Sequence, residues 1–223
     1  MTRFPLLALL TLVFCLATPA WAQQDQQQTV NSALTTVERM KSDSGFREGL
    51  QPKLDQARAV LIVPALYKAG LFFGGQYGNG VLLAKLPDGS WSYPAFYTLE
   101  GGSFGLQIGV ESTSILFLIM TEKGLQAVLN SQFKFGADSG LTVLIVGAGV
   151  GAATTANLGA DILAFSLSGI GLYAGLSLEG TVLSPRESWN AAYYGTNVAS
   201  RAIVLDNSVS NPRADALRDF LAH

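Results

Sequence analysis

Glycine alternates with strand-forming residues in several stretches, and this pattern constrains the fold more than any other feature. In residues 104–111, and again in residues 169–179, apolar side chains alternate with glycine or polar residues. Successive side chains of a strand point to opposite faces, so one face is apolar and the other is nearly bare. Glycine weakens a strand unless another backbone approaches closely or the sheet bends sharply. The pattern therefore predicts a curved or barrel-like antiparallel β-sheet.

Proline and turn residues divide the remaining apolar runs into strands. Residues 59–63 favour a buried strand that ends at Pro64. Pro87, Asp88 and Gly89 predict a tight turn, because proline presets φ and glycine accepts positive φ. We therefore expect a hairpin of residues 81–86 and 90–97. The uncharged stretch 139–160 is long enough to cross a membrane, but its glycine, threonine and asparagine favour strand–turn–strand.

Along the chain, helices are predicted before, between and after the strands. Apolar residues at helical spacing between Val30 and Met40 predict a helix that caps the core, with a membrane-surface helix as the alternative. Shorter helices are expected over residues 50–58 and 121–130. Residues 184–187 fit a capping box that opens a helix ended by Gly195, and Asn211 caps a last helix. Strands and helices do not alternate regularly, so we predict one α+β domain over residues 29–223 with flanking N-terminal and C-terminal helices.

The N-terminus has the features of a secretory signal peptide in residues 1–22. Arg3 supplies a positive charge, residues 4–17 are apolar, and Ala20-Trp21-Ala22 is a cleavage signal. Residues 23–28 then form a polar leader. We expect an exported protein, which in a bacterium lies in the periplasm or at the surface of the cell envelope. Cleavage removes Cys15, the single cysteine, so no disulfide is available.

Composition excludes several classes of function. The chain is 49% hydrophobic with a net charge of −2, which rules out disorder. Its 14 basic residues against 16 acidic ones give no surplus for a nucleic-acid partner. One cysteine and one histidine cannot form a Cys/His zinc site or a Cys–His nucleophile. We expect no metal and no cofactor.

Two motifs match catalytic signatures but lack the necessary context. G-x-G-x-x-A at residues 147–152 has no following helix and no well-spaced acidic residue, which a dinucleotide site needs. G-x-S-x-G at residues 101–105 precedes a predicted strand, and the only histidine is the terminal His223. Glu111 and Glu179 each close a glycine-rich face, and they are candidate cavity carboxylates if those faces share a cavity. A third hypothesis is an enzyme that uses Glu111 and Glu179, but we expect that the protein is not an enzyme.

Several segments between residues 57 and 195 resemble the SYLF lipid-binding domain family, in the same order. Examples are Ala57-Arg58-Ala59-Val60, Lys68-Ala69-Gly70-Leu71-Phe72 and Tyr193-Tyr194-Gly195. The other matching segments are residues 78–82, 87–94, 105–111, 135–138 and 171–180, together with Asn190. The chain departs from the family at residues 147–152, where relatives carry a turn with proline and arginine.

The resemblance implies a non-enzymatic, membrane-associated lipid-binding protein, here a bacterial exported member. Relatives bind phosphoinositides and some bind actin; export argues against actin here. The first helix carries few basic residues, so recognition through clustered cations is not expected. Candidate lipid contacts are Lys53, Arg58 and Lys68 for headgroups and Phe72 and Phe73 for the apolar part. The alternative is a structural or protein-interaction module of the envelope that does not depend on lipid.

Overall fold

The computed structural model describes residues 20–70, 73–104, 109–130, 132–136, 140–146, 159–168, 171–172 and 178–223. The helices are α1 (Ala20–Ser42), α2 (Ser44–Gln56), α3 (Glu122–Leu129), α5 (Glu187–Tyr194), α6 (Ser200–Val204), the 3₁₀ helix η1 (Pro212–Ala214) and α7 (Asp215–Ala222). The strands are β1 (Ala59–Gly70), β2 (Phe73–Ala84), β3 (Ala95–Phe104), β4 (Gly109–Ile119), β5 (Phe133–Lys134), β6 (Val143–Val146), β7 (Ile162–Ser168), β8 (Gly171–Leu172) and β9 (Val182–Pro185).

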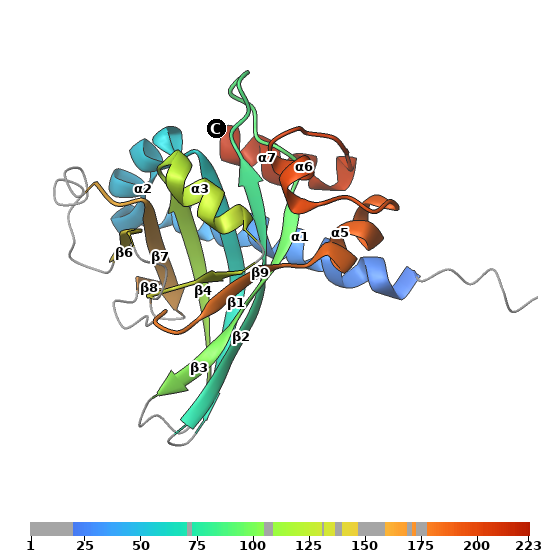
Figure 1. The fold of residues 1–223 in the computed structure, drawn as a ribbon. Coiled ribbons are helices and arrows are strands. Elements are labelled where there is room, and N and C mark those ends of the chain that lie inside the picture. Colours follow the sequence, from blue (N-terminus) through green and yellow to red (C-terminus); the bar gives the residue numbers. More distant parts are fainter. Residues whose placement is uncertain are drawn as a thin grey trace, which may run out of the picture.

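All nine strands join one sheet, in the order β5-β9-β3-β2-β1-β4-β7-β6, with β8 paired to β7. The sheet curls, and helices lie around its upper half (Figure 1). The predicted α+β class, with a curved sheet and flanking helices, is confirmed. One pair differs from the prediction, because β6 and β7 run parallel. Parallel neighbours need a crossover connection rather than a hairpin. Residues 147–158, which lie between these two strands in the sequence, are outside the described part.

Both faces of the upper sheet are buried. Leu116 and Leu118 of β4 belong to a core cluster with α1, α2, α5 and α7, and we call this side the α1 face. Phe117 belongs to a second cluster with α3 and α6, on the side that we call the α3 face. A strand that is buried on both sides reads as a continuous apolar run, as residues 115–119 do.

The first helix caps the core, as predicted. Val30, Ala33, Val37 and Met40 are buried against the sheet, so this apolar face is already covered by the protein itself. The helix starts earlier than expected, and residues 23–28 form part of its first turns. Among the described helices, none combines the length and the hydropathy needed to cross a membrane.

Short sequence motifs correctly predicted the turn and three of the points at which helices begin or end. β2 and β3 pair through the predicted turn, where Gly89 has φ +85°. Thr121 caps α3 and Gly195 ends α5 with φ +71°. The side chain of Asn211 accepts a hydrogen bond from the backbone N–H of Arg213 at the start of η1, directly before α7. These ends depend on residues close in sequence, which explains the agreement.

Two local predictions are wrong. The segment 184–187 is not a capping box, because Ser184 and Pro185 pair with β3 in strand β9 and α5 begins only at Glu187. Pro64 does not end β1 either. The strand continues to Gly70 through a β-bulge, at which the register with both neighbours shifts. Proline lacks a backbone N–H, so a bulge is one of the few places where a strand accommodates it.

The bulge in β1 changes the course of the sheet. Opposite it, Gly80 of β2 faces two residues of β1, Val63 and Pro64. On the other side, the Ser114 hydroxyl donates a hydrogen bond to the Pro64 carbonyl at 2.7 Å. A bulge bends its strand and increases the local twist. Beyond this point, the sheet continues away from the helices (Figure 1).

Candidate functional site

The lower parts of β1 to β4 form a ribbon that projects past the helices, as Figure 1 shows. We call it the distal ribbon, and it comprises residues 65–70, 73–79, 98–104 and 109–113. Tyr67 and Tyr77 pair across β1 and β2 on this ribbon. They are 53% and 45% exposed and are the large hydrophobic residues that the described surface exposes most. The ribbon therefore presents aromatic rings outside the packed core.

Toward the free end of the distal ribbon, the last charged residues of its strands lie at the level of Tyr67 and Tyr77. Lys68 pairs in register with Glu111, and Tyr77 pairs with Glu100. Nearer the strand ends, residues 69–70, 73–76, 101–104 and 109–110 include no charged residue. At about 3.3 Å per residue, the four positions from Tyr77 to Phe73 cover roughly 13 Å. The hydrocarbon core of a bilayer is roughly 30 Å thick, so the uncharged segment at the end of the ribbon is nearly as long as half of that thickness.

The glycines of the sheet fall into two groups. A methyl group added to Gly80 would lie 2.5 Å from the carbonyl oxygen of Ile62, and one added to Gly78 would lie 2.6 Å from that of Ala65. These positions need glycine because β1 passes over them at the bulge. Gly75 and Gly102 pair with each other further along, and an added methyl group would meet nothing within 4 Å. Another backbone therefore approaches Gly78 and Gly80 closely but does not approach Gly75 or Gly102. Most glycines of the stretches 104–111 and 169–179, for which close approach was predicted, lie outside the described residues.

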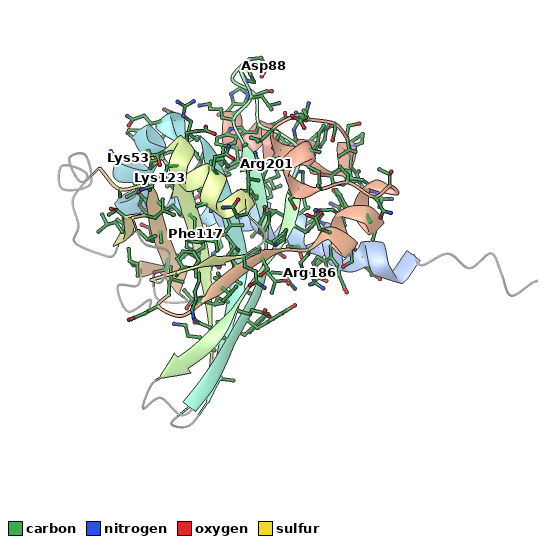
Figure 2. All side chains as sticks on the ribbon, viewed as in Figure 1. Lys53, Asp88, Phe117, Lys123, Arg186 and Arg201 are labelled. Atoms are coloured by element: carbon green, nitrogen blue, oxygen red, sulfur yellow. The ribbon has the colours of Figure 1, made fainter. Side chains whose placement is uncertain are left out.

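An open groove of about 480 Å³ lies between the N-terminal half of α1 and the start of the distal ribbon. Asp25 of α1, Tyr67, Tyr77 and Trp189 of α5 line it, together with Arg186. Arg186 directly precedes α5 and is labelled in Figure 2. The groove combines two charged side chains with three aromatic rings at the boundary of the uncharged segment.

Arg186 is fixed within this groove by uncharged partners. Its guanidinium carbon lies 3.7 Å from the centre of the Trp189 ring. Its Nη1 donates hydrogen bonds to Asn79 Oδ1 at 2.9 Å and to the Tyr77 hydroxyl at 3.3 Å. The Tyr77 hydroxyl in turn donates to Asn79 Oδ1 at 3.0 Å. The guanidinium is therefore held in place while its positive charge remains available to an anion.

The candidate lipid contacts fall at opposite ends of β1. Arg58 is exposed just before the strand, and Lys53 is half-buried on α2 (Figure 2). Lys68 and Phe73 lie on the distal ribbon, roughly 35 Å away for an extended strand of this length. Phe72 lies outside the described residues, as do the side chains of Phe73 and Glu111. Lys53 and Arg58 therefore do not share a site with Lys68 and Phe73, which remain candidates on the ribbon.

The paired-carboxylate hypothesis stays a prediction. Glu179 is exposed in the turn before β9, where the backbone N–H of Gly180 donates to the Phe135 carbonyl. Glu111 lies on β4, four places from β9 in the strand order. The described residues contain no group of three or more His, Cys, Asp or Glu side chains that could hold a metal ion. Residues 101–104 of the G-x-S-x-G motif lie within β3, not at a strand-to-helix turn, and the G-x-G-x-x-A motif is outside the described part.

Comparison with known protein families identifies the chain. The model of the Ysc84 family, described as "Las17-binding protein actin regulator", matches residues 100–223, which is more than half of the sequence. The chain belongs to the Ysc84 family. The resemblance to SYLF domains is thereby confirmed, since both names refer to this family.

Curated relatives support the same assignment. Protein YSC84 of Saccharomyces cerevisiae is 33% identical over 172 residues, which cover 75% of this chain and 36% of the relative. LAS seventeen-binding protein 3 of the same yeast is 32% identical over 169 residues, with coverage of 74% and 36%. SH3 domain-containing YSC84-like protein 1 of Homo sapiens is 25% identical over 162 residues, with coverage of 72% and 47%. The chain thus spans between a third and a half of the length of these relatives.

Sequence reasoning missed the groove. Arg186 was assigned to a helix cap, and Tyr67, Asn79 and Trp189 were not singled out. The spacing of Arg186 and Trp189 was a usable signal, because residues three apart near a helix start lie on one side. The partners on β2 gave no local signal, since Asn79 and Arg186 are 107 positions apart in sequence.

Proposed function

We propose that this member of the Ysc84 family is an exported, non-enzymatic protein that binds lipid at a membrane surface through its distal ribbon. The observation that carries the proposal is the uncharged end of the ribbon, bounded by Tyr67 and Tyr77 and by the charged residues at their level. Tyrosine is enriched at membrane–water interfaces, where its ring is buried and its hydroxyl is hydrated. With the tyrosines at the headgroups, the strand ends reach into one leaflet.

The route of attachment is apolar rather than electrostatic. The uncharged segment inserts. The tyrosines, the charged residues at their level and Glu179, whose turn packs against Gly101, limit the depth of insertion. Placing a charge beyond them opposes insertion, because a carboxylate in hydrocarbon is costly. First-helix insertion is not part of the proposal, since the apolar face of α1 is buried in the core.

Gly75 and Gly102 allow a precise test in liposome flotation. Neither position meets another atom within 4 Å of an added methyl group, so both accept a side chain without a clash. We expect the exported chain to float with vesicles of mixed phosphatidylethanolamine and phosphatidylglycerol. Gly75→Asp and Gly102→Asp should each reduce the floated fraction at least about fivefold, whereas the matched Gly75→Ser should float like the wild type. No flotation of the wild type with any vesicle would contradict the proposal.

A second candidate function is a protein-interaction module of the envelope that does not need lipid. It is favoured by the relatives' names, which describe Las17-binding and SH3 domain-containing proteins. The family description also names an actin regulator, so the expectation that actin is not a partner now depends on export alone. A stable partner recovered equally well by the wild type and by Gly75→Asp would favour this candidate.

Export itself is proposed from the signal-peptide pattern of residues 1–22. We expect the mature chain to begin at Gln23 and to be found in the periplasm or at the envelope surface if the cell is bacterial. Mass spectrometry of the N-terminus after cell fractionation checks both expectations. An intact N-terminus in the cytoplasmic fraction would contradict export and would reopen the question of actin.

A further inference from the structure

The groove beside α1 contains one positive and one negative side chain. Of the described residues that line it, only Arg186 and Asp25 are charged. No carboxylate of a described residue lies within ion-pairing distance of the Arg186 guanidinium. The two charges therefore lie on the walls of the same groove without neutralising each other by direct contact.

The surroundings of Arg186 suit the recognition of a phosphate. Guanidinium groups bind phosphate strongly because their N–H donors form a planar fork. Here both hydrogen bonds to protein atoms within the groove come from Nη1, and Trp189 supports one face of the guanidinium. Such a preorganised cation loses little conformational entropy when an anion binds.

The position of the groove matches the headgroup level of the proposed membrane contact. Tyr67 and Tyr77 line the groove and also form the boundary of the uncharged segment. Roughly 13 Å of strand separates Tyr77 from the end of β2. A lipid whose headgroup lies in the groove can therefore run its acyl chains along the ribbon toward the strand ends.

We infer that this groove binds the headgroup of a zwitterionic phospholipid such as phosphatidylethanolamine, with the phosphate on Arg186 and the ammonium group on Asp25. The inference rests on the proposed lipid function and deepens it. The balance of charges selects the headgroup class. A polyphosphorylated headgroup would place several negative charges against one arginine and one aspartate, whereas a headgroup with one charge of each sign matches the groove.

The test uses short-chain lipids that stay monomeric in water, so it does not depend on membrane insertion. Calorimetric titration compares dihexanoyl-phosphatidylethanolamine with dihexanoyl-phosphatidylglycerol, which has the phosphate but lacks the ammonium group. Arg186→Gln should weaken binding of both lipids about tenfold or more, the loss expected for a charge-assisted hydrogen bond. Asp25→Asn should weaken binding of the ethanolamine lipid several-fold and leave the glycerol lipid unchanged.

Controls separate a local effect from a loss of folding. Arg39→Gln removes an exposed arginine near the end of α1 that does not line the groove, and this variant should bind both lipids like the wild type. If Arg186→Gln folds poorly, Asp25→Asn still decides, because Asp25 is exposed on α1 and no hydrogen bond or ion pair of its side chain joins it to another described residue.

The outcomes distinguish this inference from the proposed function. Wild-type protein that floats with vesicles, but whose binding of the short-chain lipids is absent or unaffected by both groove variants, overturns the inference alone. Binding of the short-chain lipids without flotation overturns the membrane contact and retains the groove. Equal affinity of Asp25→Asn and wild type for the ethanolamine lipid overturns the assignment of the ammonium site.

Discussion

The upper and lower parts of β1 to β4 belong to the same strands, but they are stabilised differently. In the upper half, both faces are covered by helices, and residues such as Phe117 and Leu118 are almost completely buried. On the ribbon, Tyr67 and Tyr77 are about half exposed and Gly75 and Gly102 meet nothing. The bulge in β1 separates the two regions. One strand can therefore contribute to the core at one end and to an exposed surface at the other.

Truncating a core aromatic should give the largest difference between the regions. The Phe117 ring lies 5.5 Å from that of Phe135 and is 1% exposed. Phe117→Ala should lower the free energy of unfolding by about 3–5 kcal/mol, since it removes buried surface and leaves a cavity. Tyr67→Ala on the ribbon should cost less than about 1 kcal/mol. Urea unfolding measures both values, and similar losses would contradict the division of the strands into two regions.

Two glycine substitutions compare the stability of the packed and the exposed part of β2. Gly80→Ala should destabilise the protein by about 1–3 kcal/mol, because the new methyl group meets the Ile62 carbonyl at 2.5 Å and Val63 at 2.9 Å. The matched change Gly75→Ala should alter stability by less than about 0.5 kcal/mol. Thermal and urea unfolding provide the measurement. A tolerated Gly80→Ala would mean that the bulge relaxes and does not fix the bend.

A smaller effect is expected from Asp161, in the packed region. Its carboxylate accepts hydrogen bonds from the Thr121 hydroxyl at 2.6 Å and the Thr142 N–H at 3.0 Å. The Thr121 bond, followed by the Thr142 bond, holds the pKa of Asp161 below its usual range. This stabilisation is present above the ordinary pKa of aspartate, about 4, and is lost as the pH falls through the lowered value.

The corresponding measurement compares unfolding at pH 7 and pH 3. The wild type should lose about 1 kcal/mol more than Asp161→Asn between these conditions, the usual net value of a hydrogen bond. If the free energy of unfolding depends on pH equally in the wild type and in Asp161→Asn, the Asp161 carboxylate does not have the stabilising role assigned to it.

Much of the fold was predictable because its signals are local. Pro87 and Gly89 identified the hairpin, and the spacing from Val30 to Met40 identified α1. The stretch 104–111 is divided between two strands, because β3 ends at Phe104 and β4 begins at Gly109. Most of the stretch 169–179 lies outside the described residues. The capping box at residues 184–187 failed because pairing with β3 outweighed a local preference. Pro64 misled for a similar reason, since both neighbouring strands accommodate it through the bulge.

The candidate site was less predictable because its parts come from distant segments. Among the candidate lipid contacts, Lys68 and Phe73 lie on the distal ribbon, whereas Lys53 and Arg58 lie toward the opposite end of β1. The groove brings together α1, β1, β2 and the start of α5. No periodicity within any one of these segments reveals that Arg186 meets Asn79 and Tyr77.

The amino-acid sequence alone was enough to predict a curved sheet with flanking helices and to show the resemblance to SYLF proteins. These properties follow from alternation, helical spacing and turn residues, which act over a few positions. The three-dimensional structure was needed to show which glycines lie against a neighbouring strand, which glycines face open space, and where an arginine lies beside exposed tyrosines. Those contacts depend on how strands far apart in sequence bend toward one another, and a single bulge at Pro64 sets that bend.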